Sequence, residues 1–115
     1  MFSRGFADTH GLGHPSCGPV SDKSWEQAVC DYKSLPRLGS VEYWDDQAKA
    51  TYSYDAQRRI LNSYDSVQSV REKARYVWQY GLKGIIVWES SADAPPDSDR
   101  SLLRAMAQTL ANPSA

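Results

Sequence analysis

GIIVWESSADA, residues 84–94, decides the fold class that the sequence predicts. Its first five residues, GIIVW, are apolar on both faces and too few for a helix, which is typical of a parallel strand covered on both sides. The polar residues Glu89, Ser90, Ser91 and Asp93 follow at once. Trp88 therefore stands where a buried strand gives way to a polar loop, and the question is what its side chain faces.

A helix is predicted directly before this strand. Apolar residues recur there at helical spacing, at Val70, Ala74, Val77 and Trp78. Ser69 and Glu72 fit a capping box, and Gly81 supplies a left-handed stop after the last turn. We expect a helix over about residues 67–80.

A second helix is predicted after the polar loop. Its apolar stripe consists of Leu102, Leu103, Met106 and Leu110. We expect this helix near residues 99–111, capped by Asp97, Ser98 or Asp99. The order helix, buried strand, polar loop, helix is typical of a (β/α) barrel, in which binding residues lie where strand meets loop. A single parallel strand cannot close a barrel, so we expect these apolar stripes to be partly exposed.

The upstream half predicts a small antiparallel sheet. Residues 41–44, 51–55 and 59–65 are rich in Tyr, Val, Ile and Thr, and residues 56–58 form a turn between the last two runs. Residues 7–24 contain several glycines and prolines without periodicity, which predicts a long irregular loop.

A short helix is expected between this loop and the sheet. Residues Glu26 to Lys33 would form it, with Trp25, Val29 and Tyr32 on one side. The fold class predicted for the whole chain is therefore an α+β region followed by an α/β segment.

Length, charge and hydropathy exclude several classes of protein. At 115 residues the chain suits one modest domain. Thirteen Lys and Arg nearly balance fourteen Asp and Glu, so no nucleic-acid partner is implied. No apolar stretch is typical of a signal peptide or a membrane helix, so we expect no membrane partner. Cys17 and Cys30 lack a paired-ligand spacing and are equally compatible with free thiols and a disulfide, which leaves the localisation open.

Metal and nucleophile chemistry have little support in the sequence. His10 and His14 stand four residues apart, but in a Gly/Pro loop without a third ligand, so no metal site is expected. Ser90 and Ser91 lack a G-x-S-x-G context and a histidine base, so nucleophilic catalysis is not expected either.

Five segments, by their order and spacing, carry a resemblance to a known family. They are SRGF (3–6), SWEQAVCDYKSLPRLG (24–39), YSYD (52–55), SYD (63–65) and GLKGIIVWESSAD (81–93). Together they resemble the carboxy-terminal third of the chitinases of glycoside hydrolase family 18, of the fungal and bacterial endochitinase type.

The resemblance implies a domain organisation. Residues 1–6 would be the end of the seventh barrel strand, and residues 7–66 the chitinase insertion domain, a small antiparallel sheet plus a short helix. Residues 67–115 would supply helix seven, strand eight and helix eight of an incomplete (β/α)8 TIM barrel. Members of this family are commonly secreted.

The resemblance also implies substrate-binding residues. It assigns Trp88 to the floor of the subsite that holds the sugar about to be cleaved, Arg4 to a substrate contact and Glu26 to the cleft. An indole does offer a broad apolar face to a pyranose ring. From the residues alone, Trp88 is more often a core aromatic, and Arg4 and Glu26 are more often solvated surface. Trp25 either lines the cleft or packs within the insertion domain, and packing is the favoured interpretation.

The resemblance implies hydrolysis of β-1,4-linked N-acetylglucosamine polymers through a D-x-x-D-x-D-x-E motif, which this sequence lacks. Asp93, Asp97 and Asp99 do not reproduce it, and we expect them to solvate a loop and cap the last helix. The prediction is a truncated chitinase, without catalytic residues or a cofactor and inactive by itself. Its partners would be chitin or chitooligosaccharides and the missing amino-terminal barrel. The alternatives are a non-catalytic chitin binder, and a structural remnant or one half of a split enzyme.

Overall fold

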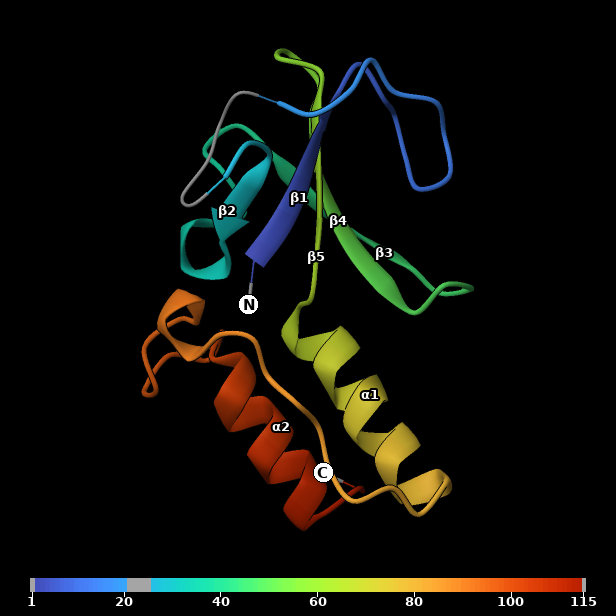
Figure 1. The fold of residues 1–115 in the computed structure, drawn as a ribbon, viewed down its shortest axis with the longest axis vertical. Helices are drawn as coiled ribbons and strands as arrows, with labels where there is room; N and C mark the ends of the chain where they lie inside the picture. Colours follow the sequence, from blue (N-terminus) through green and yellow to red (C-terminus); the bar gives the residue numbers. More distant parts are fainter. Residues whose placement is uncertain (1, 21–25, 115) are drawn as a thin grey trace.

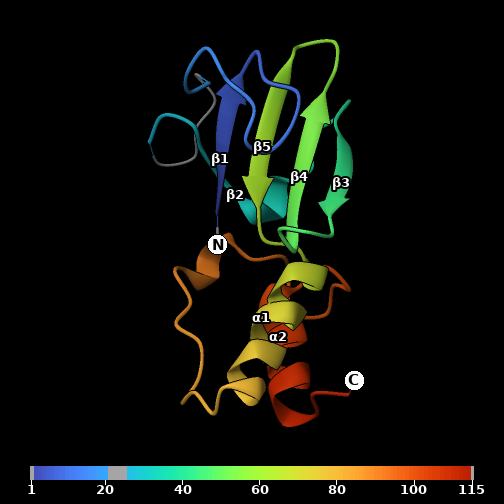
Figure 2. The ribbon, with the colours of Figure 1, turned by 90° about the vertical axis from the view of Figure 1, so that its right-hand side faces the viewer.

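The computed structural model describes residues 2–20 and 26–114, which form a sheet above a pair of helices (Figure 1). The strands are β1 (Phe2–Ala7), β2 (Val29–Asp31), β3 (Val41–Asp45), β4 (Ala50–Asp55) and β5 (Ile60–Tyr64). The helices are α1 (Val67–Gln79) and α2 (Leu102–Ala111), with short 3₁₀ turns η1 (Tyr32–Ser34) and η2 (Ser90–Ala92). Turning the molecule shows that α1 and α2 lie side by side below one end of the sheet (Figure 2).

The sheet is antiparallel, with strand order β2-β1-β5-β4-β3. Its β3, β4 and β5 confirm the three strands predicted from the Tyr-rich segments. The predicted turn between β4 and β5 is held by Asp55, whose carboxylate accepts the backbone N–H groups of Gln57 and Arg58. These bonds, with the Arg58 guanidinium, hold the pKa of Asp55 below its usual value.

The first strand lies inside this sheet. β1 pairs antiparallel with β2 on one side and with β5 on the other. The sheet therefore crosses the boundary that the sequence predicts between residues 6 and 7. Close packing there depends on Gly5, because a Cβ at this position would lie 2.6 Å from a methyl carbon of Val20 and 2.8 Å from the side-chain oxygen of Asn62.

The helix predicted over Glu26 to Lys33 is wrong. Residues Val29–Asp31 form β2, which pairs with β1 through Ser3↔Cys30 and Arg4↔Val29, and only the single turn η1 follows. A helix of eight residues has little stability by itself, whereas the free edge of β1 offers backbone hydrogen bonds to an extended segment. Tertiary pairing therefore overrides the weak local preference.

The loop predicted over residues 7–24 is irregular wherever it is described. Residues 8–20 contain no strand or helix beyond one bridge between Phe6 and Pro19. Cys17 is exposed on this loop and Cys30 is buried in β2, and both are free thiols.

Helix α1 begins one turn earlier than its predicted cap. The capping box consists of Ser66 and Ser69, each of which accepts the other's backbone N–H, and not of Ser69 and Glu72. The stop at Gly81 is confirmed, with a φ of +62°.

Helix α2 begins at Leu102 and not near residue 99. Its N-cap is Ser101, and the caps predicted at Asp97, Ser98 or Asp99 are wrong. The buried carboxylate of Asp93 accepts the backbone N–H groups of Leu102 at 2.9 Å and Leu103 at 3.0 Å, and the Ser101 hydroxyl at 3.0 Å. A negative charge at this end of the helix satisfies its free donors and its dipole.

The buried strand predicted at residues 84–88 does not form. This segment has no strand partner within residues 2–20 and 26–114. Ile85 and Val87 pack against the core, whereas Ile86 is 97% exposed and Trp88 is 76% exposed. A strand buried on both faces needs neighbours on both edges, so this short extended segment covers only one of its faces.

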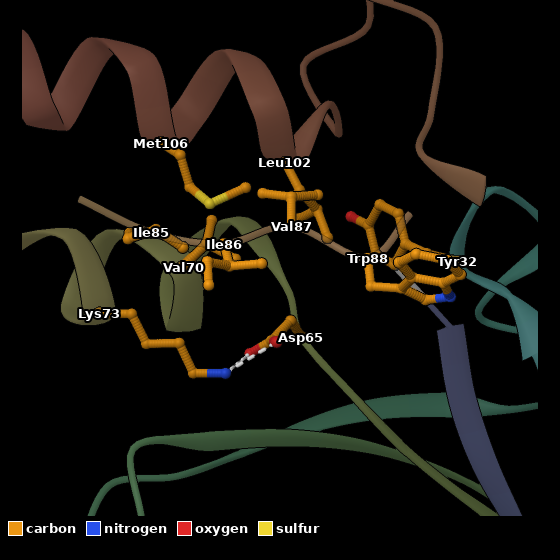
Figure 3. A pocket seen from close by; sticks show the side chains of 10 residues that line it. All are labelled: Tyr32, Asp65, Val70, Lys73, Ile85, Ile86, Val87, Trp88, Leu102 and Met106. Atoms are coloured by element: carbon orange, nitrogen blue, oxygen red, sulfur yellow. Dashed lines mark hydrogen bonds and ion pairs between the residues drawn. The ribbon is translucent and has the colours of Figure 1, made fainter. Parts of the chain in front are cut away.

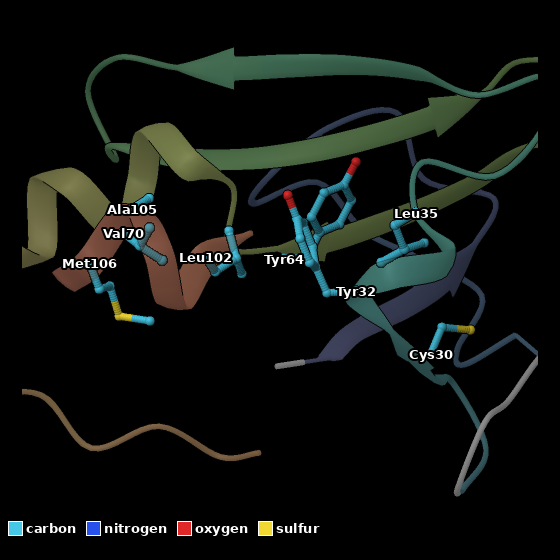
Figure 4. Packing of buried hydrophobic residues seen from close by; sticks show 8 residues of the cluster. All are labelled: Cys30, Tyr32, Leu35, Tyr64, Val70, Leu102, Ala105 and Met106. Atoms are coloured by element: carbon cyan, nitrogen blue, oxygen red, sulfur yellow. The ribbon is translucent and has the colours of Figure 1, made fainter. Parts of the chain in front are cut away.

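A shared core joins the sheet to the helices. Its buried members are Cys30, Tyr32, Leu35, Tyr64, Val70, Leu102, Ala105 and Met106 (Figure 4). The cluster contains residues from β2, η1, β5, α1 and α2, so the described chain forms one packing unit.

We predict that Asp93→Ala lowers the free energy of unfolding by about 2–3 kcal/mol, because three donors at the start of α2 lose a buried acceptor. Urea denaturation followed by circular dichroism measures this change. The control is Asp97→Ala, which removes an exposed carboxylate and should change stability by no more than about 0.5 kcal/mol. Equal effects of the two substitutions would contradict the capping role.

We predict that the isolated chain binds the dye ANS and self-associates through residues 84–88, and that Ile86→Ser reduces both. Leu38→Ser is the matched control, since Leu38 is 95% exposed but lies in the loop between η1 and β3, outside residues 84–88. Fluorescence titration and analytical ultracentrifugation are the measurements. A monodisperse wild-type chain without dye binding would show that residues 84–88 do not form an association surface.

Candidate functional site

Trp88 lies at a pocket of about 300 Å³ between α1, α2 and residues 84–88 (Figure 3). The lining residues are Tyr32, Asp65, Val70, Lys73, Ile85, Ile86, Val87, Trp88, Leu102 and Met106. Figure 3 draws Tyr32 and Trp88 at one end of the pocket and Lys73 at the other, with the aliphatic side chains between them. The pocket thus combines an aromatic end, an apolar middle and a charged end.

The pocket carries almost no net charge. At its charged end the Lys73 ammonium lies 2.7 Å and 2.8 Å from the two carboxylate oxygens of Asp65. At its aromatic end, burial raises the pKa of Tyr32 to about 12, so this hydroxyl stays protonated and neutral. A neutral, partly apolar pocket suits an uncharged ligand with an apolar face.

The loop after Trp88 is held by polar contacts. Glu89 accepts the hydroxyl of Ser91, and this hydrogen bond holds the pKa of the Glu89 carboxyl below its usual value. Lys33 donates to the Ser91 carbonyl at 2.9 Å and so ties this loop to η1. The Trp88–Glu89 peptide bond is cis.

Arg4 and Glu26 meet beside the first two strands. Arg4 lies on β1 and Glu26 just before β2, and Nη1 of Arg4 is 3.1 Å from Oε1 of Glu26. Both side chains are more than half exposed. Neither is among the described residues that line the pocket of Trp88, and Trp25 lies outside the described residues. The structure therefore brings two of the four predicted site residues into contact and places Trp88 at a separate pocket.

Two residues of this region were not singled out by the sequence. The sequence pattern places Tyr32 on one side of the predicted short helix and Lys33 only at the end of that helix. Both belong to the DYK stretch at 31–33, which lies within one of the segments that carry the family resemblance. That position was the signal that could have identified them.

Other chemistry has no cluster of residues to support it. Within residues 2–20 and 26–114, no group of three His, Cys, Asp or Glu side chains is placed to hold a metal ion. His10 instead contacts Tyr54, with Nδ1 3.1 Å from the tyrosine hydroxyl. Among the described helices, none is long and apolar enough to cross a membrane.

Related sequences were found by comparison with curated proteins. Endochitinase 1 of Metarhizium robertsii is 43% identical over 99 residues, which cover 85% of this chain and 23% of that protein. Sporulation-specific chitinase 2 of Saccharomyces cerevisiae is 33% identical over 87% of this chain and 19% of that protein. The chain therefore spans less than a quarter of the length of these relatives.

Solved structures show the same arrangement of elements. A chitinase from Bacillus thuringiensis superposes with a TM-score of 0.79 at 28% identity, over 96% of this chain and 22% of that one. A class V chitinase from Nicotiana tobaccum in complex with NAG4 superposes with a TM-score of 0.81 at 22% identity, over 95% of this chain and 32% of that one, which shows the fold alone. The sequence model of Glycosyl hydrolases family 18 matches residues 1–93. The chain accordingly belongs to glycosyl hydrolases family 18, and it corresponds to a part of its chitinase relatives.

Proposed function

We propose that this chain is the sugar-binding, carboxy-terminal part of a family 18 chitinase. In this proposal Trp88 is the platform for an N-acetylglucosamine ring of a β-1,4-linked chain, and Arg4 and Glu26 are further contacts. The observation that carries it is the exposure of Trp88, 76%, at the edge of a neutral pocket. A large aromatic exposed at a pocket is more typical of a binding surface than of a core.

The chemistry of an indole agrees with this ligand. Its flat apolar face matches the C–H face of a pyranose ring, while its N–H can donate to a hydroxyl or an acetamide oxygen. The apolar middle of the pocket, formed by residues such as Val70 and Met106, suits the N-acetyl methyl group. A charged saccharide would gain nothing from the neutralised Asp65–Lys73 pair.

The Arg4–Glu26 pair can serve as the polar part of the site. The pair is exposed, so the association of these two groups contributes little to stability. The Arg4 guanidinium can donate hydrogen bonds to sugar hydroxyls, and the Glu26 carboxylate can accept hydrogen bonds from them. Because both groups are exposed, neither bond leaves a buried charge uncompensated.

Hydrolysis requires a general acid, and we propose that it comes from outside this chain. Family members use the D-x-x-D-x-D-x-E motif, which this sequence does not contain. The carboxylates near Trp88 have other roles, since Asp93 caps α2 and Glu89 accepts the Ser91 hydroxyl. The chain alone would therefore bind without turning over its substrate.

The same proposal gives the domain organisation. Residues 1–6 are the end of a barrel strand, residues 7–66 an insertion domain, and residues 67–115 the last helix, strand and helix of a (β/α)8 barrel. The bare face of residues 84–88 supports it, because this segment has the apolar content of a barrel strand but no neighbouring strands in the described chain. One alternative is a stand-alone chitooligosaccharide binder, and another is a structural remnant.

We predict that the isolated chain does not hydrolyse a fluorogenic chitooligosaccharide at pH 4–8. A fluorimetric assay of the purified chain tests this, with Trp88→Ala as the control for contaminating chitinase. Turnover that co-purifies with the chain and is lost in Trp88→Ala would overturn the proposed lack of a general acid.

We predict that chitotriose binds with a dissociation constant of about 1 mM or weaker, since one aromatic platform contributes only about 1 kcal/mol beyond area burial. Trp88→Ala should abolish the binding, and Glu26→Ala should weaken it less. Trp78→Ala is the matched control, because Trp78 is also exposed, at 55%, but lies away from the Trp88 pocket. NMR titration measures these constants.

Two results would change the proposal. Micromolar affinity would favour the stand-alone binder, because it would mean that no further subsites are needed. Sugar-induced shifts that avoid Trp88 would make it a core residue of a larger fold and not a sugar platform.

A further inference from the structure

Arg100 links the start of α2 to the sheet. One of its guanidinium nitrogens, Nη2, donates to the Leu35 carbonyl at 3.1 Å and lies 3.4 Å from Oε2 of Glu42 on β3. The guanidinium carbon also lies 5.2 Å from the centroid of the Tyr32 ring, which is a cation–π distance. One side chain thus contacts η1, its C-cap residue and β3, all of which lie 58 or more residues earlier in the sequence.

Glu42 extends this contact into the core. Its Oε2 accepts the hydroxyl of Tyr64 at 2.6 Å, and burial together with this bond raises the pKa of Tyr64. Tyr64 in turn packs against Tyr32, with ring centroids 6.2 Å apart. The Tyr32 ring is therefore held by Arg100 on one side and by a fixed tyrosine on another.

Tyr32 separates two recesses. It lines the pocket of Trp88, and it also lines a second pocket of about 350 Å³ that contains Arg100, Glu42 and Trp44. Only 2% of its surface is exposed, so its ring can move only if these neighbours move. Of these two pockets, Trp88 lines the first and Arg100 lines the second, and Tyr32 lines both.

We propose that Arg100 is a positioning residue for sugar binding, which acts by holding the Tyr32 ring as the wall of the Trp88 pocket. This inference rests on the proposed function of Trp88. A planar guanidinium can lie over a ring and donate to Leu35 and Glu42 at the same time, whereas an ammonium group is a compact point charge. The role therefore requires arginine and not merely a positive charge.

The test compares Arg100→Met, Arg100→Lys and the matched control Arg104→Met. Arg104 lies four residues later, in the first turn of α2, and its side chain has similar exposure, 41% against 43%, but it pairs with Asp99. For each variant, urea denaturation gives the stability, and NMR gives the sugar-free indole N–H resonance of Trp88 and the affinity for chitotriose.

Both Arg100 variants should shift the indole resonance and weaken chitotriose binding by about two- to fivefold, the effect of losing one partly exposed cation–π contact. Arg100→Lys should recover most of the stability lost in Arg100→Met, but not the resonance or the affinity. Arg104→Met should leave the resonance and the affinity unchanged.

The inference fails if Arg100→Lys restores the resonance and the affinity, since Arg100 would then be only an ion-pair partner of Glu42. It also fails if neither Arg100 variant moves the resonance. If the indole resonance of Trp88 in the wild-type chain does not respond to sugar, the proposed function is refuted. If the sugar-free indole resonance still differs between the wild-type chain and the Arg100 variants, the positioning of Tyr32 by Arg100 is nevertheless supported.

Discussion

The packing of Tyr32 and Tyr64 against the amino-terminal ends of the two helices is the contact on which the rest of the structure depends. These rings, with Leu102 and Val70, form the region where the sheet and the helices share one core. Neither the sheet nor the pair of helices has a large core of its own. One face of the sheet is partly exposed, and two helices alone bury little apolar surface. The positions of Arg4, Glu26 and Trp88 relative to one another follow from this junction.

A second constraint is the bare face of residues 84–88. A five-residue apolar strand is fully buried only if both of its faces and both of its edges are covered. Ile85 and Val87 cover one face by packing on the helices, and Ile86 and Trp88 are left in solvent. We expect this exposure to let the segment associate with other molecules and, in the proposed function, to let Trp88 contact a sugar.

Elements with strong local signals could be predicted from the sequence. The three strands with Tyr-rich alternation formed as expected, and α1 formed with its stop at Gly81. Errors arose where a distant partner decided the outcome. The segment after Glu26 became β2 because the edge of β1 was free, and α2 starts at Leu102 because Ser101 caps it and the Asp93 carboxylate accepts its first N–H groups.

The candidate site likewise has some features that local sequence predicts and others that depend on distant partners. Local motifs and their order identified the family, and through it Trp88, Arg4 and Glu26 as the residues to propose. The contact between Arg4 and Glu26 needed β1 and β2 to pair, which spacing alone does not indicate. Tyr32 and Arg100 were missed as a pair because 68 residues of chain separate them and neither has an unusual local sequence.

The sequence by itself therefore determined the family and the strands and helices with strong periodicity. Those features depend on neighbouring residues, whose propensities and spacing are local properties. Only the tertiary structure decided which strand edges pair, which carboxylate caps α2, and which face of residues 84–88 is covered. These outcomes depend on burial and on hydrogen-bond partners supplied by distant segments, which local sequence does not encode.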